Sequence, residues 1–259
     1  MITVPGGERW RTVETGESAF DVHEHGWGPA VILVGTGLVA DRLLPLAREP
    51  VLAQGRRVIA YRRRGYGGSG PVGSPGSLER DAGDCLALMD ALGIEHAALV
   101  GFAHSAAVAL ETAAESPGRV DHLCLIDPPP LQASCSGEYR TANAELLAEY
   151  QAIGAWPAAD RYLWRLMDRG WRLDLERLIP GSVADVERDA ATFFTADLPA
   201  LMSWNFARAD AERIAAPVLL VSGTLSNRWF AEELCELREW LPHSQDAVIP
   251  DADHSLVLT

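Results

Sequence analysis

The chain has 259 residues, of which 48% are hydrophobic and 22% charged, and its formal net charge is −14. This length and composition are typical of a soluble globular protein with a large core, and the negative charge argues against nucleic acid or an anionic membrane surface as a partner. No apolar run approaches the length of a membrane span, and residues 1–10 lack the basic-then-apolar order of a signal peptide. We therefore expect a cytoplasmic protein, monomeric or homodimeric, whose partner is a small-molecule substrate.

The cysteines give no sign of a metal centre. None of them belongs to a Cys-x-x-Cys pair or lies near a histidine at the spacing of metal ligands. The expectation is reduced thiols, no metal and no cofactor. The four residues are Cys85, Cys124, Cys135 and Cys235.

The first part of the chain alternates strand and helix patterns. Residues 9–25 alternate apolar and polar side chains, which predicts an antiparallel hairpin at a sheet edge. Residues 30–34 are continuously apolar, as expected of a strand buried on both faces, and end in a Gly-rich turn at 35–38. A helix is predicted over 43–54 and another strand over 57–61.

Three consecutive arginines, 62–64, precede a Gly-rich segment at 65–70. Such a cluster could bind phosphate or nucleic acid. We favour a structural interpretation, in which the glycines make tight turns and one arginine ties neighbouring loops through their carbonyl groups. Residues 78–92 then form an amphipathic helical pattern that ends at Gly93, a typical C-cap residue.

The most informative stretch spans residues 96–119. An apolar run at 97–100 breaks at Gly101, and a helical pattern resumes over 105–114, which predicts a strand, a sharp turn and a helix. Gly101 and Ser105 stand two positions either side of Ala103, in the frame G-x-S-x-G that holds a nucleophile on a strained turn. Alanine has no nucleophilic atom, so the frame is complete but its reactive group is missing.

A second chemical signal follows the next buried strand, residues 120–126. The strand ends at Asp127, and a carboxylate at the carboxyl end of a parallel strand lies where open α/β sheets form their sites. The alternative is an aspartate that only caps its turn. Residues 216–223 and 246–249 read as further strands around a helix at 229–240, and the last strand is followed by a loop that carries His254.

Residues 131–212 break the alternation and contain helical patterns but no strand. Aromatic side chains concentrate there, and a cap rich in them suggests an apolar or aromatic substrate. For any single aromatic residue, packing in the interior of this segment is the competing explanation. The helices are expected near 142–152, 158–170, 183–192 and 198–209, and the candidate substrate-binding tryptophans are Trp156, Trp164 and Trp204.

These segments, in this order, resemble the α/β-hydrolase superfamily. The match is strongest over L-V-G-F-A-H-S-A-A-V-A-L and the Pro-x-Arg-Val exit from its helix, and only position 103 departs from the pattern. The resemblance implies an α/β-hydrolase fold with a mostly parallel, doubly wound sheet, formed by residues 1–130 and 213–259. Residues 131–212 would be an inserted α-helical cap. The chain stops five residues after His254, which leaves open whether a terminal helix has been truncated.

The resemblance also assigns a catalytic set. Position 103 would hold the nucleophile, where serine is expected, His254 would be the general base, and Asp127 would orient it. Ser226 stands where the commoner branch of the superfamily has the acid, so we predict that Asp127 takes that role and lies within hydrogen-bond reach of His254.

The same resemblance identifies the oxyanion loop as residues 35–38. The backbone N–H groups of His104 and of Gly37 or Leu38 would form the oxyanion hole, and Thr36 would line the substrate site with the three tryptophans. An ordinary strand-to-helix turn is the competing interpretation of the loop. His104 is more simply a wall of the pocket than an acid or base.

The implied reaction is hydrolysis of an ester, lactone or thioester, which cannot run through a covalent intermediate at Ala103. Three explanations are open. The chain can be an engineered inactive variant of a serine enzyme, which we favour. It can be a natural lyase, cyclase or decarboxylase that uses His254 as acid and base. It can be a ligand-binding receptor on a hydrolase scaffold that has no catalytic activity.

Overall fold

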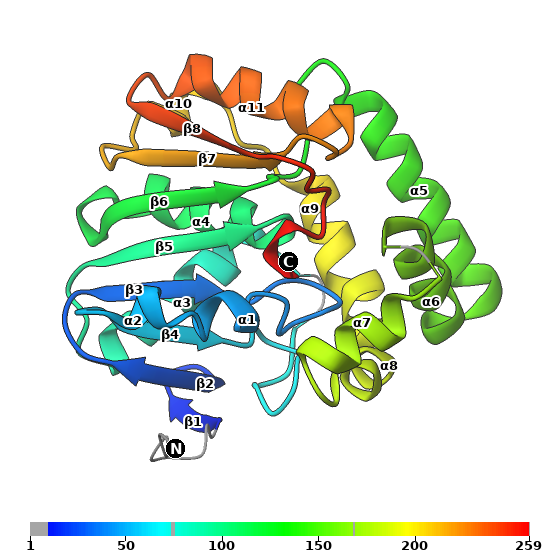
Figure 1. Cartoon of the computed structure of the whole chain (residues 1–259), viewed down its shortest axis with the longest axis horizontal. Helices are drawn as coiled ribbons and strands as arrows, with labels where there is room; N and C mark the ends of the chain where they lie inside the picture. The colour runs from blue at the N-terminus through cyan, green and yellow to red at the C-terminus, as the bar shows by residue number, and fades with distance from the viewer. Residues whose placement is uncertain (1–9, 74–75, 168, 259) are drawn as a thin grey trace.

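A computed structural model describes residues 10–73, 76–167 and 169–258. These residues form an eight-stranded sheet in the order β1-β2-β4-β3-β5-β6-β7-β8 (Figure 1). The pairs β1–β2 and β2–β4 are antiparallel and the others parallel, which confirms the predicted α/β-hydrolase fold class. The strands are β1 (Arg11–Glu14), β2 (Ala19–Gly26), β3 (Ala30–Val34), β4 (Arg57–Tyr61), β5 (Ala97–Phe102), β6 (Val120–Ile126), β7 (Val218–Gly223) and β8 (Ser244–Ile249).

The central strands are buried on both faces, because helices cover the sheet from two sides. Ile32 and Val34 of β3 point into one hydrophobic core with helices α3 (Leu78–Ala91) and α4 (His104–Glu115). Val31 and Leu33 point into a second core with α1 (Leu44–Ala47) and helices of the segment 131–212. The continuous apolar run of β3 is thus explained by alternation between two cores. Figure 1 shows α1 and α2 (Pro50–Ala53) in front of the sheet and α3 and α4 behind it.

The helix predicted over 43–54 is interrupted. The chain forms two short helices, α1 (Leu44–Ala47) and α2 (Pro50–Ala53). Glu49 between them is extended, with φ −62° and ψ 118°. The ring of Pro50 disfavours helical geometry in the preceding residue, which explains the break.

The described part of residues 131–212, a segment we call the cap, is mainly helical, as the sequence predicts (Figure 1). In Figure 1, α5 to α8 lie beyond the carboxyl ends of β5 and β6, with α9 between them and the sheet. The helix predicted over 198–209 ends early, at Ser203, because the backbone of Trp204 is extended. The sequence did not predict α7. The helices are α5 (Ser136–Ile153), α6 (Ala155–Met167), α7 (Trp171–Leu178), α8 (Ser182–Thr192), a π-helical turn (Phe193–Asp197), α9 (Leu198–Ser203) and α10 (Arg208–Ala211).

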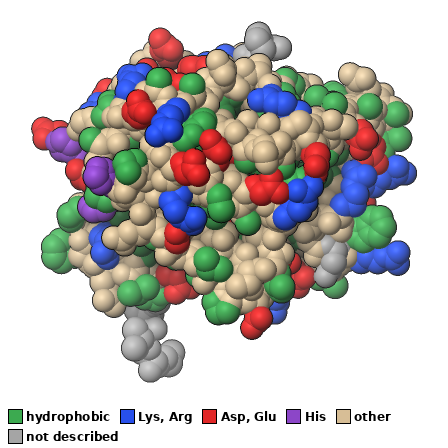
Figure 2. Space-filling model, turned by 90° about the horizontal axis from the view of Figure 1, so that it is seen from above, with side chains coloured by type: hydrophobic (Ala, Val, Ile, Leu, Met, Phe, Trp, Pro, Cys, Tyr) green, Lys and Arg blue, Asp and Glu red, His purple; other side chains and the backbone are tan. Residues whose placement is uncertain are grey.

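The last described residues lie on the front face of the sheet in Figure 1. After α11 (Arg228–Trp240) and β8, a short 3-10 turn, Leu256–Leu258, packs near α1. Among the described residues, no helix has the length and apolarity needed to cross a membrane. Figure 2 shows basic and acidic side chains interspersed over the face seen from above.

The three consecutive arginines have the structural role that we favoured. Arg63 donates from Nε to the carbonyl of Gly35 at 2.8 Å, so it ties the turn after β4 to the loop after β3. Arg62 pairs with Asp41, and Arg64 makes two hydrogen bonds of 2.6 Å to one carboxylate. All three guanidinium groups are thus already bound to carboxylates of the chain itself.

Candidate active site

The turn between β5 and α4 is strained at Ala103. This residue has φ 48° and ψ −120°, a region that non-glycine residues rarely occupy and that costs about 1–3 kcal/mol. A Cβ atom at Gly101 would lie 2.6 Å from Ala106 Cα, so only glycine fits there. The hydroxyl of Ser105 accepts the N–H of Phe102 at 3.0 Å and braces the turn. The chain thus maintains a strained conformation at a residue whose side chain is a methyl group.

Asp127 and His254 lie together, as predicted. Asp127 Oδ2 is 3.0 Å from His254 Nδ1, within the expected range, and the Asp127 side chain is fully buried. The same oxygen accepts a hydrogen bond of 2.7 Å from the hydroxyl of Ser226. Ser226 in turn accepts the N–H of Gly223 at 3.2 Å. Ser226, which stands where the commoner superfamily pattern has an acid, therefore binds and orients the Asp127 carboxylate.

The surroundings of His254 favour a neutral imidazole. Its ring stacks on Phe230 at 4.3 Å with an interplanar angle of 4°, and Phe102 lies 4.6 Å away. Burial lowers the pKa of His254, and the charge of Arg42 lowers it further, against the opposing effect of Asp127. Because the ionised carboxylate only accepts, Nδ1 carries the proton in the neutral ring, which leaves Nε2 free as a base.

Of the two backbone N–H groups predicted as oxyanion donors in the loop after β3, those of Gly37 and Leu38, only one is free of another partner among the described residues. The N–H of Leu38 donates to the hydroxyl of Tyr66 at 3.0 Å, so it is not free to bind an oxyanion. Tyr66 itself donates to Asp197 Oδ2 at 2.6 Å. Among the described residues, no hydrogen bond engages the N–H of Gly37, whose missing side chain leaves room for Asp197. The assignment of the Leu38 N–H to the oxyanion hole is therefore corrected, and the N–H of Gly37 is the remaining candidate donor in this loop.

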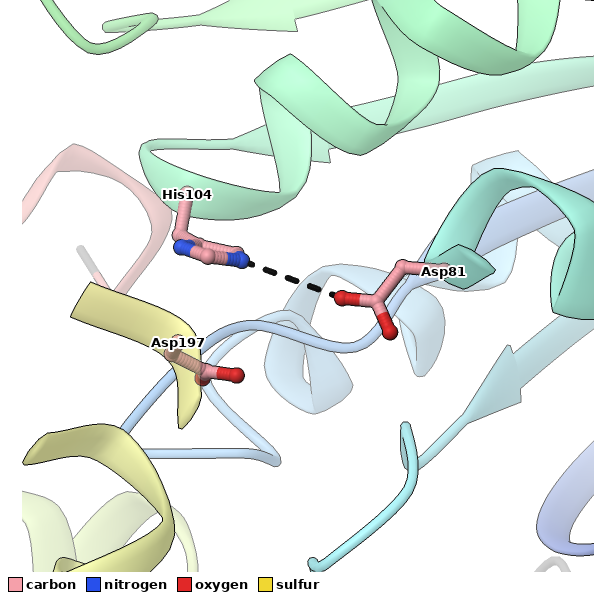
Figure 3. A group of neighbouring side chains, drawn as sticks. All are labelled: Asp81, His104 and Asp197. Atoms are coloured by element: carbon pink, nitrogen blue, oxygen red, sulfur yellow. Dashed lines mark ion pairs between the residues drawn. The ribbon is translucent and has the colours of Figure 1, made fainter. Parts of the chain in front are cut away.

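His104 belongs to a buried polar cluster behind this loop. Figure 3 shows its ring facing Asp81, with Asp197 nearby, and the distance from Nε2 to Asp81 Oδ2 is 4.0 Å. Neither ring nitrogen has a hydrogen-bond partner among the described residues. The three side chains could surround a cation by their spacing. Arg63 already binds both carboxylates, at 2.5 Å to Asp81 and 2.6 Å to Asp197. The cluster is thus a buried ion-pair network that supports the Gly-rich loop.

A cavity of about 80 Å³ connects these groups. Its lining includes polar or charged residues and many apolar side chains, and the former comprise Thr36, Arg42, His104, Asn143 and His254, with Ala103 among the latter. A larger opening of about 400 Å³ adjoins it between α5, α6 and α11, and the two share Tyr139, Asn143, Tyr162, Leu166 and Phe230. The apolar lining comprises Leu163, Phe193, Leu198, Leu201 and Phe230, among others. Tyr162, Asn143 and Phe230 were not singled out by the sequence, because only the packing of the cap on the core brings them here.

The three candidate tryptophans lie outside this cavity, so their assignment is corrected. Trp204 is buried in the core that α3 and α4 share with the sheet, and it donates from Nε1 to Glu111 of α4 at 2.8 Å. Trp156 packs against Trp171 inside the cap, with ring centroids 6.2 Å apart. Trp164 is 44% exposed. The large apolar area of indole is used here for packing within the core and the cap, and phenylalanine, tyrosine and leucine line the cavity instead.

A family model described as "Alpha/beta hydrolase family" matches residues 22–259. The chain belongs to the α/β-hydrolase family. Among solved structures, it is similar to the enol-lactonase from Burkholderia xenovorans, with a TM-score of 0.77 and 22% identity over 95% of this chain and 93% of that one. This likeness between two members of the α/β-hydrolase fold concerns the fold alone.

Two curated relatives of this α/β-hydrolase match about half of it. One is the dihydrolipoyllysine-residue acetyltransferase component of the acetoin cleaving system of Pseudomonas putida, 36% identical over 46% of this chain and 32% of that protein. The other is the 2-hydroxy-6-oxononadienedioate/2-hydroxy-6-oxononatrienedioate hydrolase of Cupriavidus pinatubonensis, 33% identical over 48% of this chain and 46% of that protein. The chain thus spans less than half the length of both curated relatives.

Proposed function

We propose that this site hydrolyses carbonyl substrates when serine stands at position 103, and that the chain with Ala103 binds such substrates without turning them over. The observation that supports this most is the strained turn at Ala103, which lines the same cavity as His254. Strained backbone persists where the surrounding structure enforces it, typically at functional sites. An alanine gains nothing from this conformation, whereas a serine there would present its hydroxyl to the cavity.

In the proposed reaction, Nε2 of His254 takes the proton from the serine hydroxyl as its oxygen attacks the carbonyl carbon. Asp127 holds the other ring nitrogen at 3.0 Å and stabilises the imidazolium that forms. The imidazolium then gives its proton to the leaving oxygen or sulfur, and an acyl group remains on the serine. A water molecule, deprotonated by His254, attacks the acyl group and releases the acid.

The negative oxygen that develops on the carbonyl needs two donors. The N–H of His104, at the first turn of α4, is one, because such amides have no partner within their own helix. The N–H of Gly37 is the other. The ion-pair network of Arg63, Asp81 and Asp197 keeps the loop in place, so the donors are positioned before substrate arrives.

The cavity lining supports an apolar acyl or alcohol group. Several leucine and phenylalanine side chains face the space beyond position 103. The enol-lactonase and the oxononadienedioate hydrolase among its relatives act, by their names, on a lactone and on an unsaturated oxo acid. We therefore propose esters, lactones and related carbonyl compounds as the substrate class.

The test is the A103S variant, assayed on a panel of p-nitrophenyl esters, thioesters and lactones beside the unchanged chain. We expect turnover by A103S only, with a difference on the order of a million-fold, the usual loss on removing a nucleophile. If the unchanged chain converts a panel member while A103S is inert, the site performs non-hydrolytic chemistry. If both are inert and a compound binds tightly to each, the protein is a receptor.

A further inference from the structure

Arg42 is a buried cation in the wall of the candidate active site. Its side chain is 3% exposed and lines the cavity that contains Ala103 and His254. Its guanidinium group lies 5.0 Å from the centre of the Phe102 ring, so it sits beside the proposed base. No sequence motif pointed to it.

The hydrogen-bond partners of this guanidinium group are few, and none of them is charged. Nη2 donates to the carbonyl of His254 at 3.0 Å and to the hydroxyl of Ser255 at 3.4 Å, and Nη1 approaches the sulfur of Met167 at 3.4 Å. Nε has no hydrogen-bond partner among the described residues. Across residues 10–73, 76–167 and 169–258, no carboxylate oxygen lies within 4.0 Å of a guanidinium nitrogen of Arg42.

Among the described residues, the other buried arginine has charged partners. Arg63, which is 2% exposed, binds two carboxylates at 2.5 and 2.6 Å. Burial of a charge without a counter-ion is costly, and proteins normally pair it. Burial lowers the pKa of Arg42 to about 10, which still leaves it protonated at neutral pH. A permanent positive charge therefore faces the cavity without a direct counter-ion.

We propose that Arg42 binds a carboxylate carried by the substrate, so that this site selects carbonyl compounds that are also acids. This proposal deepens the proposed function and rests on it, because the ligand is a substrate only if the site is catalytic. A guanidinium group has five N–H donors in a planar fork that suits a carboxylate. Tyr162 lines the same cavity, and burial raises the pKa of its hydroxyl against the opposing charge of Arg42, so the hydroxyl stays protonated and can serve as a second donor.

The binding test uses the chain as it is, because Ala103 cannot consume an ester through an acyl intermediate. Isothermal titration compares the monoethyl esters of succinic, adipic and suberic acids with their neutral diethyl esters. The three lengths cover different spans between carbonyl and carboxylate. We expect at least one monoester to bind more tightly than its diester, by about ten- to a hundred-fold, the usual contribution of a hydrogen bond to a charged group.

The variants separate recognition of the anion from support of the loop. R42M should lose the preference for the monoester while its affinity for the diester changes less than threefold. R42K, which keeps the charge, should retain part of the preference. R161M is the matched control, since Arg161 pairs with Glu149 and lines neither the cavity nor the outer opening, and it should behave like the parent.

Two results would overturn the proposal. One is that none of the monoesters binds the parent chain better than its diester, a comparison that needs no folded variant. The other is that R42M weakens monoester and diester equally, which would make Arg42 a positioning residue for the loop at His254. Activity is scored separately with A103S on diethyl esters, so a hydrolase without acid selectivity is distinguished from a selective binder without hydrolysis.

Discussion

Replacement of Asp127 by asparagine tests the proposed charge network, with A103S as the parent. The carboxylate oxygen is 3.0 Å from His254 Nδ1 and the aspartate is fully buried. At an effective dielectric constant of about 20, the attraction between a unit negative charge and the imidazolium at that distance is about 5.5 kcal/mol. Loss of this term from the transition state lowers the rate by about four orders of magnitude.

The assay measures kcat/KM of the A103S and A103S/D127N proteins on the best p-nitrophenyl ester from the panel. D121N is the matched control, because Asp121 lies on β6, the strand that Asp127 follows, but is exposed. Affinity for the ester, measured in the Ala103 background, should change less than threefold. If the double variant keeps more than a tenth of the A103S rate with an unchanged melting temperature, Asp127 does not stabilise the imidazolium.

Three further predictions concern the surroundings of this pair. In A103S, S226A should lower kcat/KM about tenfold, because Asp127 loses a hydrogen-bond donor; an unchanged rate would make Ser226 dispensable. Burial lowers the pKa of His254, so the rate of A103S should rise with pH through a midpoint below 6.5, and a midpoint above 6.5 would contradict the neutral base. Burial raises the pKa of Glu233 to about 7, so the free energy of unfolding should fall as pH rises from about 4.5 to 7. E233Q should then be stabilised relative to the parent at pH 8 by up to about 3 kcal/mol but not at pH 4, and equal denaturation midpoints at pH 8 would refute this.

The strands of the sheet could be predicted closely, because burial on both faces leaves a continuous apolar run in the sequence. β3, β4 and β6 have the predicted bounds. The break between α1 and α2 depends on Pro50 alone, a local rule that the apolar pattern outweighed in the prediction. Helix α7 was missed because its apolar positions, Trp171 and Leu175, are spaced across a strongly charged segment.

The candidate site divides along similar lines. The order of motifs along the chain located Ala103, Asp127 and His254, since each follows a recognisable strand. The bond between Leu38 and Tyr66 could not be predicted, because it joins two loops 28 residues apart. The position of Arg42 in the cavity wall could not be predicted either, because it depends on contacts between segments far apart in the sequence. A residue in a loop gives no local signal in the sequence of what the folded chain brings against it.

The central claim is that position 103 is a nucleophile position activated by His254, and covalent labelling tests it most directly. The A103S protein is treated with a fluorophosphonate, and the labelled residue is located by peptide mass spectrometry. The unchanged chain is a matched control that retains every other serine, including Ser105 in the same turn. The account predicts one adduct, at position 103 of A103S, that is lost in A103S/H254A and absent from the unchanged chain. A folded A103S protein that stays unlabelled, or an adduct that forms equally without His254, would contradict it.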